Sequence, residues 1–575
     1  MRSERPFVLL DDARPGGQAL LFADPVAIVR ADRLEEVRPA LEELRGAALH
    51  AAGFLTYEAG HALEPRLVGI GGRATLPLLW FGLFERAEAV DAAAWLPDPE
   101  GAYVGSPRPL IARADYLAQV AAVQRAIAAG DIYQANLTFD CAVPFAGDPR
   151  AAYAGLRQRQ QAGHGALVFT GEDWLVSLSP ELFFTLENGR LVTRPMKGTA
   201  PREADDEAAI ARLRADPKQR AENLMIVDLL RNDLSRVAAA GSVSTPELFA
   251  VETYPTLHQM TSTVAAQLAG ERDAIDALAA LFPCGSIAGA PKIRAMEIIA
   301  DVERRARGVY TGAIGRLDPG GDAAFNVAIR TLRLRAGEGV ASLGLGSGIV
   351  ADSDPADEWR ECLGKGGFVA SQQRFDLIET MAFDPEEGLP RLDRHMARMK
   401  ASADALGFAF DRHAARNELQ AATFRLRRPA RIRLLAGRGG EMAVEVRAMP
   451  AAPAGPVGVA LAPLPVDRGD FRLRHKTTER GFYDDARRAS GAFEVAFVDS
   501  EGFLTEGSFT SLFVERDGML LTPPLSRGLL PGVLRAELIE EARAIEVDLT
   551  PADLAGGFLI GNALRGLLPA RILGL

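Results

Sequence analysis

Residues 282–292 read FPCGSIAGAPK, and residues 307–315 read RGVYTGAIG. These glycine-containing runs accompany two segments in which a lysine and a glutamate stand four residues apart. The two pairs are Lys218 with Glu222 and Glu361 with Lys365. On a helix such a pair shares one face, and taken alone it is most often a solvated salt bridge. Because both Lys/Glu pairs occur together with both glycine-containing runs, we expect a functional site rather than two surface salt bridges.

The bulk composition indicates a soluble globular protein. A chain of 575 residues is too long for one core, so we expect two to four domains. A formal net charge of −11 argues against nucleic acid or an anionic membrane as the main partner. Three widely spaced cysteines indicate neither a disulfide scaffold nor a zinc site. Because the N-terminus carries no signal pattern, we expect a cytoplasmic location.

The chain divides at the glycine-containing stretch Lys365–Phe368. We predict a first domain at 1–366, in which residues 1–110 are a possible amino-acid-binding or subunit-binding portion, and a second domain at 367–575. The proline-rich and alanine-rich tract at 449–456 suits a linker, so the second domain is expected to have lobes at about 374–450 and 457–575. Strand-like and helical stretches alternate in both, which indicates an α+β fold.

From about Asp115 to Lys365, including GDIYQANL at 130–137, the chain resembles the chorismate-utilising enzymes, the family of anthranilate synthase, isochorismate synthase and aminodeoxychorismate synthase component I. The resemblance implies a large domain of β-sheets surrounded by helices, with chorismate as substrate and Mg²⁺ as cofactor. It implies that Glu222 and Glu361 bind the metal and that Glu358 lies next to it. Mg²⁺ prefers oxygen ligands and keeps positions open for water or substrate.

The same resemblance supplies candidate substrate-binding residues. They are Ser286, Tyr310, Arg330, Gly346, Gly348 and Lys365, which offer cations, backbone amides or hydroxyl groups to an anion. His258 stands where the family has a histidine beside the departing hydroxyl group, so we expect it to be catalytic. Ala288 replaces a frequent threonine of the family, and Ser286 or backbone amides are expected to compensate.

Lys197, in TRPMKGT at 193–199, selects the reaction. Enzymes similar to anthranilate synthase carry a small residue here, whereas aminodeoxychorismate synthases carry a lysine. The resemblance implies that Lys197 attacks C2 of the ring and expels the C4 hydroxyl group, after which ammonia enters at C4 and displaces the lysine. Glu181 is the matching general acid. A lysine nucleophile must lose its proton, so burial or a cationic neighbour has to lower its pKa.

The register of one hairpin bears on how Glu181 and Lys197 meet. Asn188-Gly189 is typical of a two-residue turn, which sets residue 181 opposite residue 196. Strict alternation would then direct Glu181 and Lys197 to opposite faces. Both can reach one substrate only if the strand breaks or bulges near Pro195, which is what we expect.

From Glu379 onward the chain resembles fold-type IV pyridoxal phosphate enzymes, which include branched-chain and D-amino-acid aminotransferases and aminodeoxychorismate lyase. The resemblance implies an α/β domain of two lobes in which Lys476 is the catalytic lysine bound to the cofactor, Glu506 pairs with its pyridine nitrogen and Arg398 holds its phosphate. The backbone at Val533 and Leu534 is expected to bind the phosphate at a helix start. Leu534 replaces a family threonine and Ser511 a frequent asparagine, while Asn562 is a candidate substrate contact.

The two resemblances together predict a bifunctional enzyme of 4-aminobenzoate biosynthesis for folate. The first domain would aminate chorismate at C4, and the second would eliminate pyruvate from the product. Because no Cys-His-Glu glutaminase set is visible, we expect ammonia from a separate glutamine amidotransferase subunit or from free ammonium. A homodimer through the second domain is a further expectation.

Two alternatives stay open at this point. One is an anthranilate-type or salicylate-type chorismate enzyme fused to a branched-chain or D-amino-acid aminotransferase. The other is a non-enzymatic role, in which residues 1–110 sense an amino acid or bind a subunit while one catalytic domain is inactive. Lys197 argues against the first, and the intact set of Lys197, Glu222, Glu361 and Lys476 argues against the second.

Overall fold

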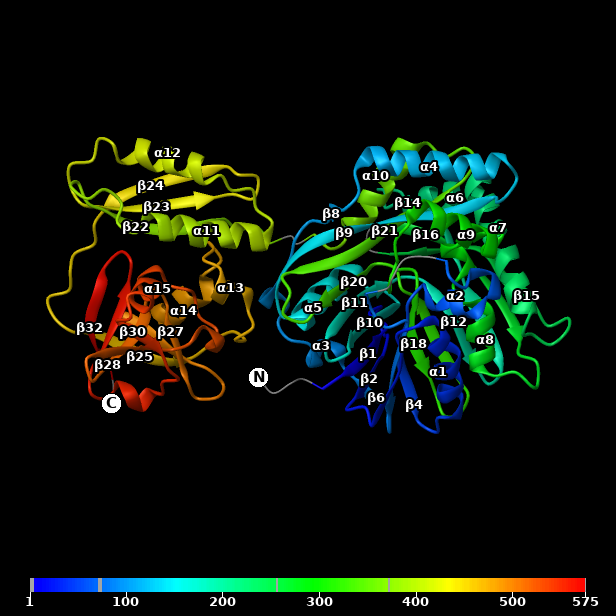
Figure 1. The fold of residues 1–575 in the computed structure, drawn as a ribbon, viewed down its shortest axis with the longest axis horizontal. Coiled ribbons are helices and arrows are strands. Elements are labelled where there is room, and N and C mark those ends of the chain that lie inside the picture. Colours follow the sequence, from blue (N-terminus) through cyan, green and yellow to red (C-terminus); the bar gives the residue numbers. More distant parts are fainter. Residues whose placement is uncertain (1–4, 71–74, 255–256, 371–372, 574–575) are drawn as a thin grey trace. The chain divides into compact units, whose positions relative to one another are not determined.

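The computed structural model describes residues 5–70, 75–254, 257–370 and 373–573. Helices and strands are mixed along the whole of this range, which confirms the α+β class (Figure 1). The chain forms two compact units. The first consists of Met1–Pro99, Ser106–Val143 and Ala152–Ala370. The second consists of Glu100–Gly105, Pro144–Ala151 and Ser371–Leu575, so it includes two short segments from the earlier part of the sequence.

Two large sheets form the framework of the first unit. Within the described ranges, one sheet has eleven strands, with the main order β17 (Gly289–Ala290), β9 (Gln134–Gly147), β21 (Val340–Ile349), β20 (Thr331–Arg335), β11 (Asp173–Ser179), β10 (His164–Phe169), β1 (Phe7–Asp11), β2 (Ala19–Ala23) and β6 (Glu88–Val90). The short strands β7 (Ala102–Val104) and β8 (Arg108–Pro109) also pair with β9, and β7 lies in the second unit.

The other sheet carries the hairpin of Lys197. Its ten strands, counted over the same ranges, include the order β14 (Met196–Pro201), β16 (Leu257–Gln267), β13 (Arg190–Arg194), β12 (Leu182–Glu187), β19 (Ala323–Val327), β18 (Ala313–Leu317), β4 (His50–Leu55), β5 (Leu79–Phe84) and β3 (Ala27–Ala31), while β15 (Ser244–Thr253) pairs with β16. Its pairs are antiparallel, so buried and solvated faces can alternate along each strand.

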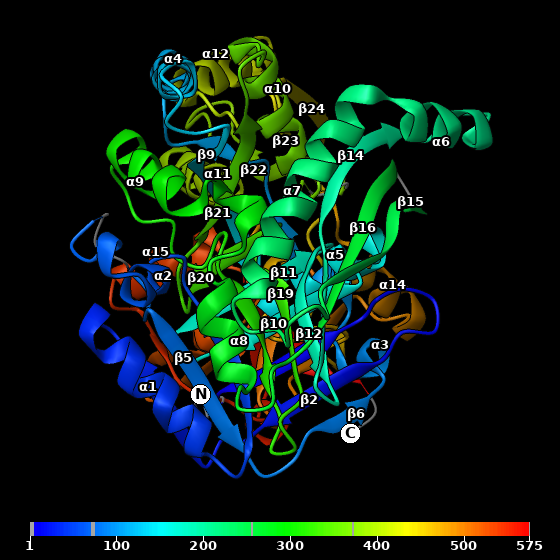
Figure 2. The same ribbon diagram turned by 90° about the vertical axis from the view of Figure 1, so that its right-hand side faces the viewer.

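Helices lie against these sheets. They are α1 (Leu34–Gly46), α2 (Ala59–Leu63), α3 (Ala92–Trp95), α4 (Arg113–Ala128), α5 (Pro149–Gln160), α6 (Asp206–Ala215), α7 (Pro217–Ser235), α8 (Ala274–Leu281), α9 (Lys292–Glu303) and α10 (Pro355–Gly366). Single 3₁₀ turns are η1 (Pro65–Leu67), η2 (Pro99–Gly101) and η3 (Gly285–Ile287). Figure 2 shows α7 running along β16 and β14. Apolar residues of α7 share a core cluster with phenylalanines of β12 and β19.

The two helices that carry the predicted metal ligands begin in the same way. The Asp216 carboxylate accepts hydrogen bonds from the first backbone amides of α7, and Asp354 does the same for α10. A proline follows each aspartate, where its missing N–H and fixed φ cost the helix nothing. Asp-Pro therefore sets the start of each helix, and with it the positions of Glu222 and Glu361.

The expected two-residue turn is confirmed, but the expected pairing of residue 181 with residue 196 is wrong, because a bulge between Leu182 and Thr185 shifts the register and sets Leu182 opposite Arg194. Asn188 and Gly189 have φ of 50° and 75°, and Glu187 pairs with Arg190 across them. Strand β13 ends at Arg194 and β14 begins at Met196, so the chain does break at Pro195. The register along β16 then shifts between Met196 and Thr199. One extra residue is accommodated at Lys197-Gly198, which changes the face to which Lys197 points.

The second unit contains two further sheets. The first is β22 (Leu377–Phe383), β23 (Ala430–Ala436) and β24 (Met442–Ala448), covered by α11 (Leu392–Leu406) and α12 (Arg412–Thr423). The other has the order β27 (Leu504–Gly507), β26 (Glu494–Val498), β25 (Val457–Pro463), β32 (Gly566–Ile572), β31 (Phe558–Asn562), β28 (Ser511–Arg516), β29 (Met519–Thr522) and β30 (Ala544–Glu546). The remaining helices are α13 (Phe471–Arg474), α14 (Gly481–Ser490) and α15 (Val533–Glu540), with 3₁₀ turns η4 (Leu525–Arg527) and η5 (Pro551–Leu554).

A segment from early in the sequence completes the core of the second unit. Tyr103 of β7 is buried against Phe375 and Phe471, and its hydroxyl group donates to Leu406 O. The Glu100 carboxylate accepts from Arg472 in α13, which ends two residues before Lys476. Residues 100–105 therefore support the element that leads into the predicted cofactor lysine.

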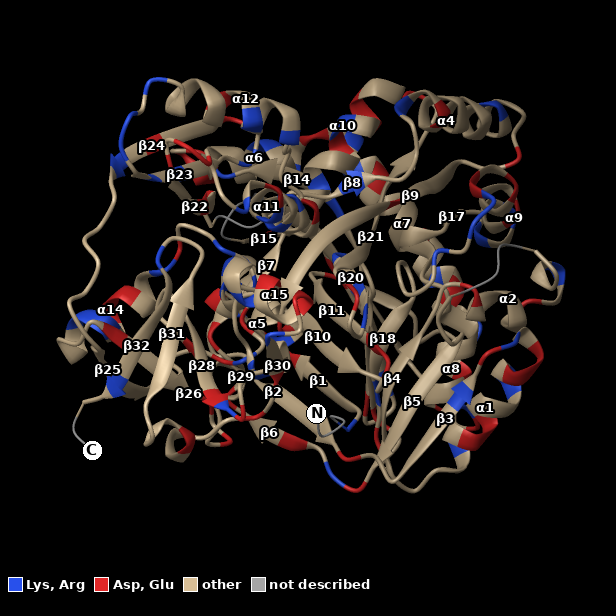
Figure 3. Ribbon diagram, turned by 60° about the vertical axis from the view of Figure 1, so that its left-hand side comes forward, with Lys and Arg blue, Asp and Glu red and all other residues tan. Residues whose placement is uncertain are grey.

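Charge is distributed rather than segregated. Figure 3 shows lysines and arginines interspersed with aspartates and glutamates along most elements. Across the four described ranges, every helix is too short or too polar to cross a lipid bilayer.

Candidate active sites

The backbone around Lys197 is fixed by close packing. Gly198 has φ of 96°, and a Cβ there would lie 3.1 Å from Gln219 Oε1 and 3.3 Å from Met260 Cβ. Asn223 Nδ2 donates a hydrogen bond to Lys197 O over 3.4 Å. The bulge that turns Lys197 thus requires glycine at the next position and is held against α7.

Lys197 lies among four charged groups. Burial lowers the pKa of its amine, and the Lys365 ammonium group lowers this pKa further. The carboxylates of Glu222, Glu181 and Glu361 act in the opposite direction. The structure therefore brings the expected nucleophile, the expected acid and both expected metal ligands into one electrostatic neighbourhood. Burial is the strongest of these influences, and it shifts the Lys197 amine toward its neutral, nucleophilic form.

Glu181 is placed to act as an acid. It lies just before β12 and is only 4% exposed. Burial raises the pKa of its carboxyl group to about 7. Ser286 Oγ donates to Glu181 Oε1 over 2.7 Å, so the serine expected to bind substrate instead orients the acid. A carboxyl group that is partly protonated near neutral pH can donate a proton to a leaving hydroxyl group.

The three predicted metal-site carboxylates have different surroundings. Glu361 pairs with Lys365 over 2.7 Å, and Ser353 Oγ donates to Glu358 over 2.6 Å. Over the described ranges, no three His, Cys, Asp or Glu side chains are grouped so as to hold a metal ion. Two carboxylates, Glu222 and Glu361, near one lysine still fit Mg²⁺, which is often held by one or two carboxylates with water and substrate oxygens.

Several of the predicted anion-binding residues lie on or beside β21. Lys365 Nζ donates to Gly346 O over 3.0 Å, and a Cβ on Gly348 would lie 3.1 Å from Lys197 Nζ. Tyr310 is buried with its ring directly against Gly344. Arg330 has φ of 49° and donates to Gln160 Oε1 over 3.3 Å, while burial lowers the pKa of its guanidinium group. No direct contact joins Arg330 to Lys197.

His258 has an environment that the sequence did not predict. It is fully buried on β16, where Nε2 lies 3.0 Å from Asp206 Oδ1 and Nδ1 lies 3.0 Å from Thr253 Oγ1. Both ring nitrogens thus have protein partners on α6 and β15. The structure does not bring His258 into contact with Lys197 or Glu181, and its catalytic role stays a prediction.

A cavity of about 430 Å³ in the second unit gathers the residues expected to hold pyridoxal phosphate. Its volume lies in the range of small-molecule sites. The predicted residues that line it are Arg398, Lys476, Glu506, Ser511, Val533, Leu534 and Asn562. Ile378 of β22 donates its amide hydrogen to Lys476 O, which anchors the lysine at the edge of the three-stranded sheet.

Lys476 and Glu506 both have strongly shifted pKa values. Burial lowers the pKa of the Lys476 amine to about 7, and Arg398 adds to this effect. Burial raises the pKa of the Glu506 carboxyl group to about 7. Tyr483 donates its hydroxyl hydrogen to Glu506 Oε1, which fixes the carboxyl group at the cavity wall. An amine that is largely neutral near pH 7 can attack a carbonyl group.

The phosphate end of the cavity is also formed. Arg398 donates to both oxygens of Glu379 and to Pro531 O, so its guanidinium group has a fixed orientation. Helix α15 begins at Val533, where free backbone amides attract an anion. Ser511 Oγ would lie 2.8 Å from a Cβ on Gly532, so this hydroxyl group sits close to the helix start. These residues fit a phosphate-bearing cofactor despite Leu534.

The side chain of Asn562 forms hydrogen bonds mainly to the backbone of nearby loops. Its Nδ2 donates to Phe509 O over 3.1 Å, and its Oδ1 accepts from the amides of Leu564 and Arg565. It lines the cavity, but these bonds indicate that its main role is to shape the loop.

Six arginines that line this cavity were missed by sequence reasoning, among them Arg431 and Arg433. Arg431 and Arg433 point to the same face of β23, while Ile432 and Leu434 are fully buried on the other face. Both arginines line the cavity, and Arg433 lies close enough to contribute to the lowered pKa of Lys476. The alternation RIRL at 431–434 could have identified a strand with a basic face, although not what that face borders.

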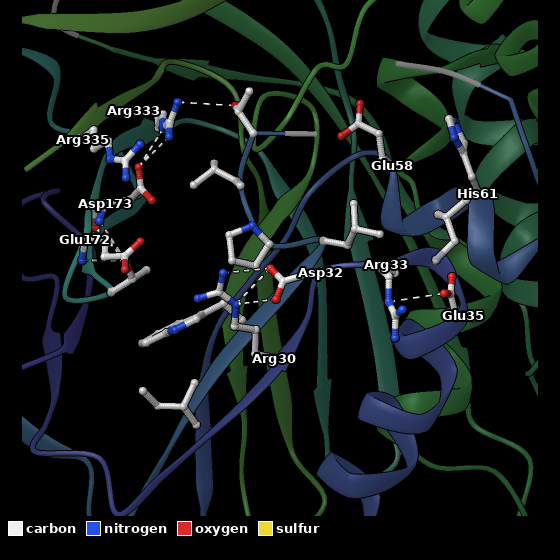
Figure 4. A pocket seen from close by; sticks show the side chains of 18 of the residues that line it. Arg30, Asp32, Arg33, Glu35, Glu58, His61, Glu172, Asp173, Arg333 and Arg335 are labelled. Carbon is white, nitrogen blue, oxygen red and sulfur yellow. Dashed lines mark hydrogen bonds and ion pairs between the residues drawn. The ribbon is translucent and has the colours of Figure 1, made fainter. Parts of the chain in front are cut away.

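Another cavity, of about 870 Å³, lies in the first unit, and no predicted catalytic residue lines it. Figure 4 shows charged residues around its walls, among them Arg333 paired with Asp173, Arg30 paired with Asp32, and Glu58 near His61. Most of its lining comes from the first 110 residues, the portion expected to bind an amino acid or a subunit.

Each unit thus defines a site built around a half-buried lysine whose pKa is lowered. Comparison with known proteins agrees with this class. The chain belongs to the family of chorismate binding enzymes, whose sequence profile matches residues 5–371, and residues 376–573 match the amino-transferase class IV family.

Two relatives and one solved structure illustrate the similarity. Aminodeoxychorismate synthase component 1 of Klebsiella aerogenes is 44% identical over 258 residues, which cover 44% of this chain and 57% of the relative. Anthranilate synthase component 1 of Streptomyces coelicolor is 42% identical over 259 residues, covering 44% and 50%. The alignments therefore span about half the length of these relatives. Anthranilate synthase component I from Streptococcus pneumoniae TIGR4 has a TM-score of 0.54 and 26% identity, covering 61% of this chain and 92% of that one.

Proposed function

We propose that this chain converts chorismate into 4-aminobenzoate in two steps, one in each unit. The first unit aminates chorismate at C4 with the help of Lys197 and Mg²⁺. The second unit releases pyruvate from the aminated product with the help of Lys476 and pyridoxal phosphate. The observation that carries the proposal is the position of Lys197, a half-buried lysine at a strand bulge whose amine is desolvated and close to Glu181.

Overall similarity does not choose between the two chorismate reactions. The relative named aminodeoxychorismate synthase component 1 is 44% identical, and the one named anthranilate synthase component 1 is 42% identical. The choice rests on Lys197 itself, because an amine there can occupy C2 and direct ammonia to C4. Glu181 supports this choice, since its carboxyl group can supply the proton that the departing hydroxyl group needs.

The first reaction balances as an exchange of hydroxyl for amine. The neutral amine of Lys197 forms a bond to C2, the ring double bonds shift, and the C4 hydroxyl group leaves as water with a proton from Glu181. Ammonia then forms a bond to C4, the double bonds shift back, and the Lys197 amine leaves C2. Chorismate and ammonia thus give 4-amino-4-deoxychorismate and water. Glu222 and Glu361 would hold Mg²⁺, which supplies a cation for a substrate carboxylate.

The second reaction is supported by the charge of the cavity. The proposed intermediate carries two carboxylates, whereas a branched-chain amino acid carries one carboxylate and an apolar side chain. Arg431 and Arg433 border the cavity, and within the described ranges Arg433 Nε is buried without a hydrogen-bond partner. They suit the dicarboxylate better than the apolar side chain, which favours the lyase over the aminotransferase.

Within this step, pyridoxal phosphate supplies an electron sink for the bond that loses its proton. The Lys476 amine would take the proton from the ring carbon and return it to the departing enolpyruvyl group, which becomes pyruvate as the ring becomes aromatic. Glu506 would hold the pyridine nitrogen, and Arg398 with the start of α15 would hold the phosphate. Ammonia is proposed to come from a separate glutamine amidotransferase, as the name component 1 of the relatives suggests.

The test is product analysis on the full chain with chorismate, Mg²⁺ and ammonium, with and without pyridoxal phosphate. We expect 4-aminobenzoate and pyruvate with the cofactor, and accumulation of 4-amino-4-deoxychorismate without it. A chelator should abolish both outcomes. Anthranilate or salicylate as the main product would contradict the first step, and amino-group transfer to a keto acid without pyruvate release would contradict the second.

A further inference from the structure

Arg472, in α13, carries a buried charge to which the proposed reaction gives no role. Its side chain is only 7% exposed, and Arg472 is not among the residues that line the cavity expected to hold pyridoxal phosphate. Removing a guanidinium group from water is costly unless carboxylates and hydrogen-bond acceptors surround it. The partners of Arg472 therefore indicate what this residue holds together.

Three carboxylates surround this arginine. The buried Asp470 accepts from Arg472 Nη2 over 2.6 Å and from Nε over 3.0 Å. Glu100 accepts from Arg472 Nη1 over 2.7 Å, while its own side chain remains 67% exposed. Burial raises the pKa of the Glu479 carboxyl group, and the nearby Arg472 charge opposes this rise. Arg472 thus joins the early segment at residues 100–105 to α13.

One set of contacts leads from Arg472 to Lys476. Helix α13 ends at Arg474, two residues before Lys476. Asp470 caps this helix by accepting the Arg472 amide hydrogen over 2.8 Å, so one carboxylate binds both the backbone and the guanidinium group of Arg472. A helix of four residues has little stability of its own. Its orientation, and with it the approach to Lys476, therefore depends on these contacts.

A second set of contacts leads to Glu506. The Arg472 guanidinium group lies over the ring of Phe482, 5.1 Å from its centroid, and the Phe482 ring is 4.2 Å from that of Tyr483. Tyr483 is buried and donates its hydroxyl hydrogen to Glu506 Oε1. Burial raises the pKa of Tyr483, and Asp470 is near enough to raise it further. Arg472 thus contacts the elements that present both groups expected to act on the cofactor.

We propose that Arg472 is a positioning residue of the second reaction. It fixes Lys476 through α13 and Glu506 through the adjacent aromatic rings, and it is itself held by residues 100–105. Because Glu100 and Arg472 are 372 residues apart, the second site then depends on a segment from the early part of the sequence. This inference rests on the proposed function, in that Lys476 and Glu506 act together in the release of pyruvate.

The experiment measures pyruvate release from added 4-amino-4-deoxychorismate by the full chain, with the rate expressed per bound pyridoxal phosphate. Arg472→Met alone would leave a buried carboxylate without its partner, so it is combined with Asp470→Asn, which removes that charge and still caps the helix. We expect the double variant to lower kcat about tenfold to a hundredfold, since a small displacement of reacting groups costs this much. KM should change less than about twofold, because Arg472 does not line the cavity.

The absorbance of the bound cofactor supplies a second readout. Glu506 is expected to stabilise the proton on the pyridine nitrogen, so a displaced Glu506 should lower the pKa of that nitrogen. In the double variant the absorbance should therefore titrate at lower pH than in the unsubstituted chain. A loss of stability alone would reduce the amount of bound cofactor without moving this titration.

Glu100→Lys tests the contribution of the early segment. It places a cation against Arg472 at an exposed position, and we expect kcat to fall about threefold to tenfold with KM unchanged. Glu515→Lys is the matched control, because it makes the same charge change at another exposed glutamate. Arg474→Met, which removes an exposed arginine from α13, is the control for Arg472. Both controls should keep the wild-type kcat.

The outcomes separate the inference from the proposed function. Wild-type kcat per bound cofactor in the double variant, with an unchanged absorbance titration, would overturn the inference and show that Arg472 only stabilises the fold. Wild-type kcat in Glu100→Lys would overturn the part assigned to residues 100–105. Failure of the unsubstituted chain to release pyruvate would instead overturn the proposed function, and this inference with it.

Discussion

Each of the two units contains a half-buried lysine with a lowered pKa, but the two lysines are surrounded by opposite charge. Lys197 has one cationic neighbour, Lys365, and three carboxylates. Lys476 has three arginine neighbours, at 398, 480 and 433, and one carboxylate, Glu379. The first set of neighbours fits a metal cation and an acid, and the second fits a phosphate and a substrate with two carboxylates. Burial makes either lysine reactive, whereas the neighbours indicate what it acts upon.

The largest effect is expected from substitution of Lys476, which should stop the second reaction and leave the first intact. Lys476→Ala should reduce pyruvate release by about 10⁴-fold or more, because it removes both the cofactor attachment and the proton carrier. 4-Amino-4-deoxychorismate should then accumulate, as followed by chromatography. Lys400→Ala, which removes an exposed lysine paired with Asp404, is the control. Unchanged pyruvate release in Lys476→Ala would remove the lyase assignment.

Substitution of Lys197 should have an almost equally large effect, on the first reaction and not on the second. Lys197→Ala should reduce amination of chorismate by at least about a thousandfold, since the nucleophile is gone. Added 4-amino-4-deoxychorismate should still be converted at the wild-type rate, which shows that the second unit is intact. Lys218→Ala, at an exposed ion pair with Asp352, should leave both rates unchanged. A variant at Lys197 that still aminates at C4 would show that this lysine only contributes charge.

A smaller effect is expected in the pH dependence of the first reaction. Burial raises the pKa of Glu181 to about 7, and only its protonated form can donate to the leaving hydroxyl group. The fraction of Glu181 that can donate falls about tenfold per pH unit well above pH 7, and amination should fall with it once the Lys197 amine is neutral. Glu181→Gln should lower the rate and abolish this decline, as measured by initial rates between pH 6 and 9. An unchanged decline in Glu181→Gln would assign it to another group.

The smallest effect tests the arginine environment of Lys476. In the protein without cofactor, covalent attachment of pyridoxal phosphate should accelerate as pH rises through about 7, because the neutral amine is the nucleophile. Arg433→Met removes a cation and should raise this midpoint by about half a unit to one unit. Absorbance gives the rate. A midpoint that does not move would mean that Arg433 does not contribute to the pKa of Lys476.

Much of this arrangement could be predicted from the sequence, because the decisive residues lie in local motifs. The turn at Asn188-Gly189 and the break at Pro195 are both present, whereas the bulge between Leu182 and Thr185, which shifts the pairing by one residue, was not expected from the sequence. Asp-Pro at the start of α7 and α10 likewise placed Glu222 and Glu361 on helices.

The remaining features depend on contacts between distant parts of the chain. The partners of His258 are Asp206 and Thr253 on neighbouring elements, which a single sequence does not pair. Tyr103 packs in the core of the second unit against Phe375, which lies more than 260 residues further along the chain. Arg433 was missed for the same reason, since a basic strand face acquires meaning only when Lys476 is seen beside it.

The central claim is that one lysine in each unit serves a separate step, with a diffusible intermediate between them. The most direct test mixes equal amounts of the Lys197→Ala and Lys476→Ala proteins with chorismate, Mg²⁺, ammonium and pyridoxal phosphate. The account predicts that neither protein alone forms 4-aminobenzoate and that the mixture does. Formation of 4-aminobenzoate by either protein alone, or none by the mixture, would contradict it.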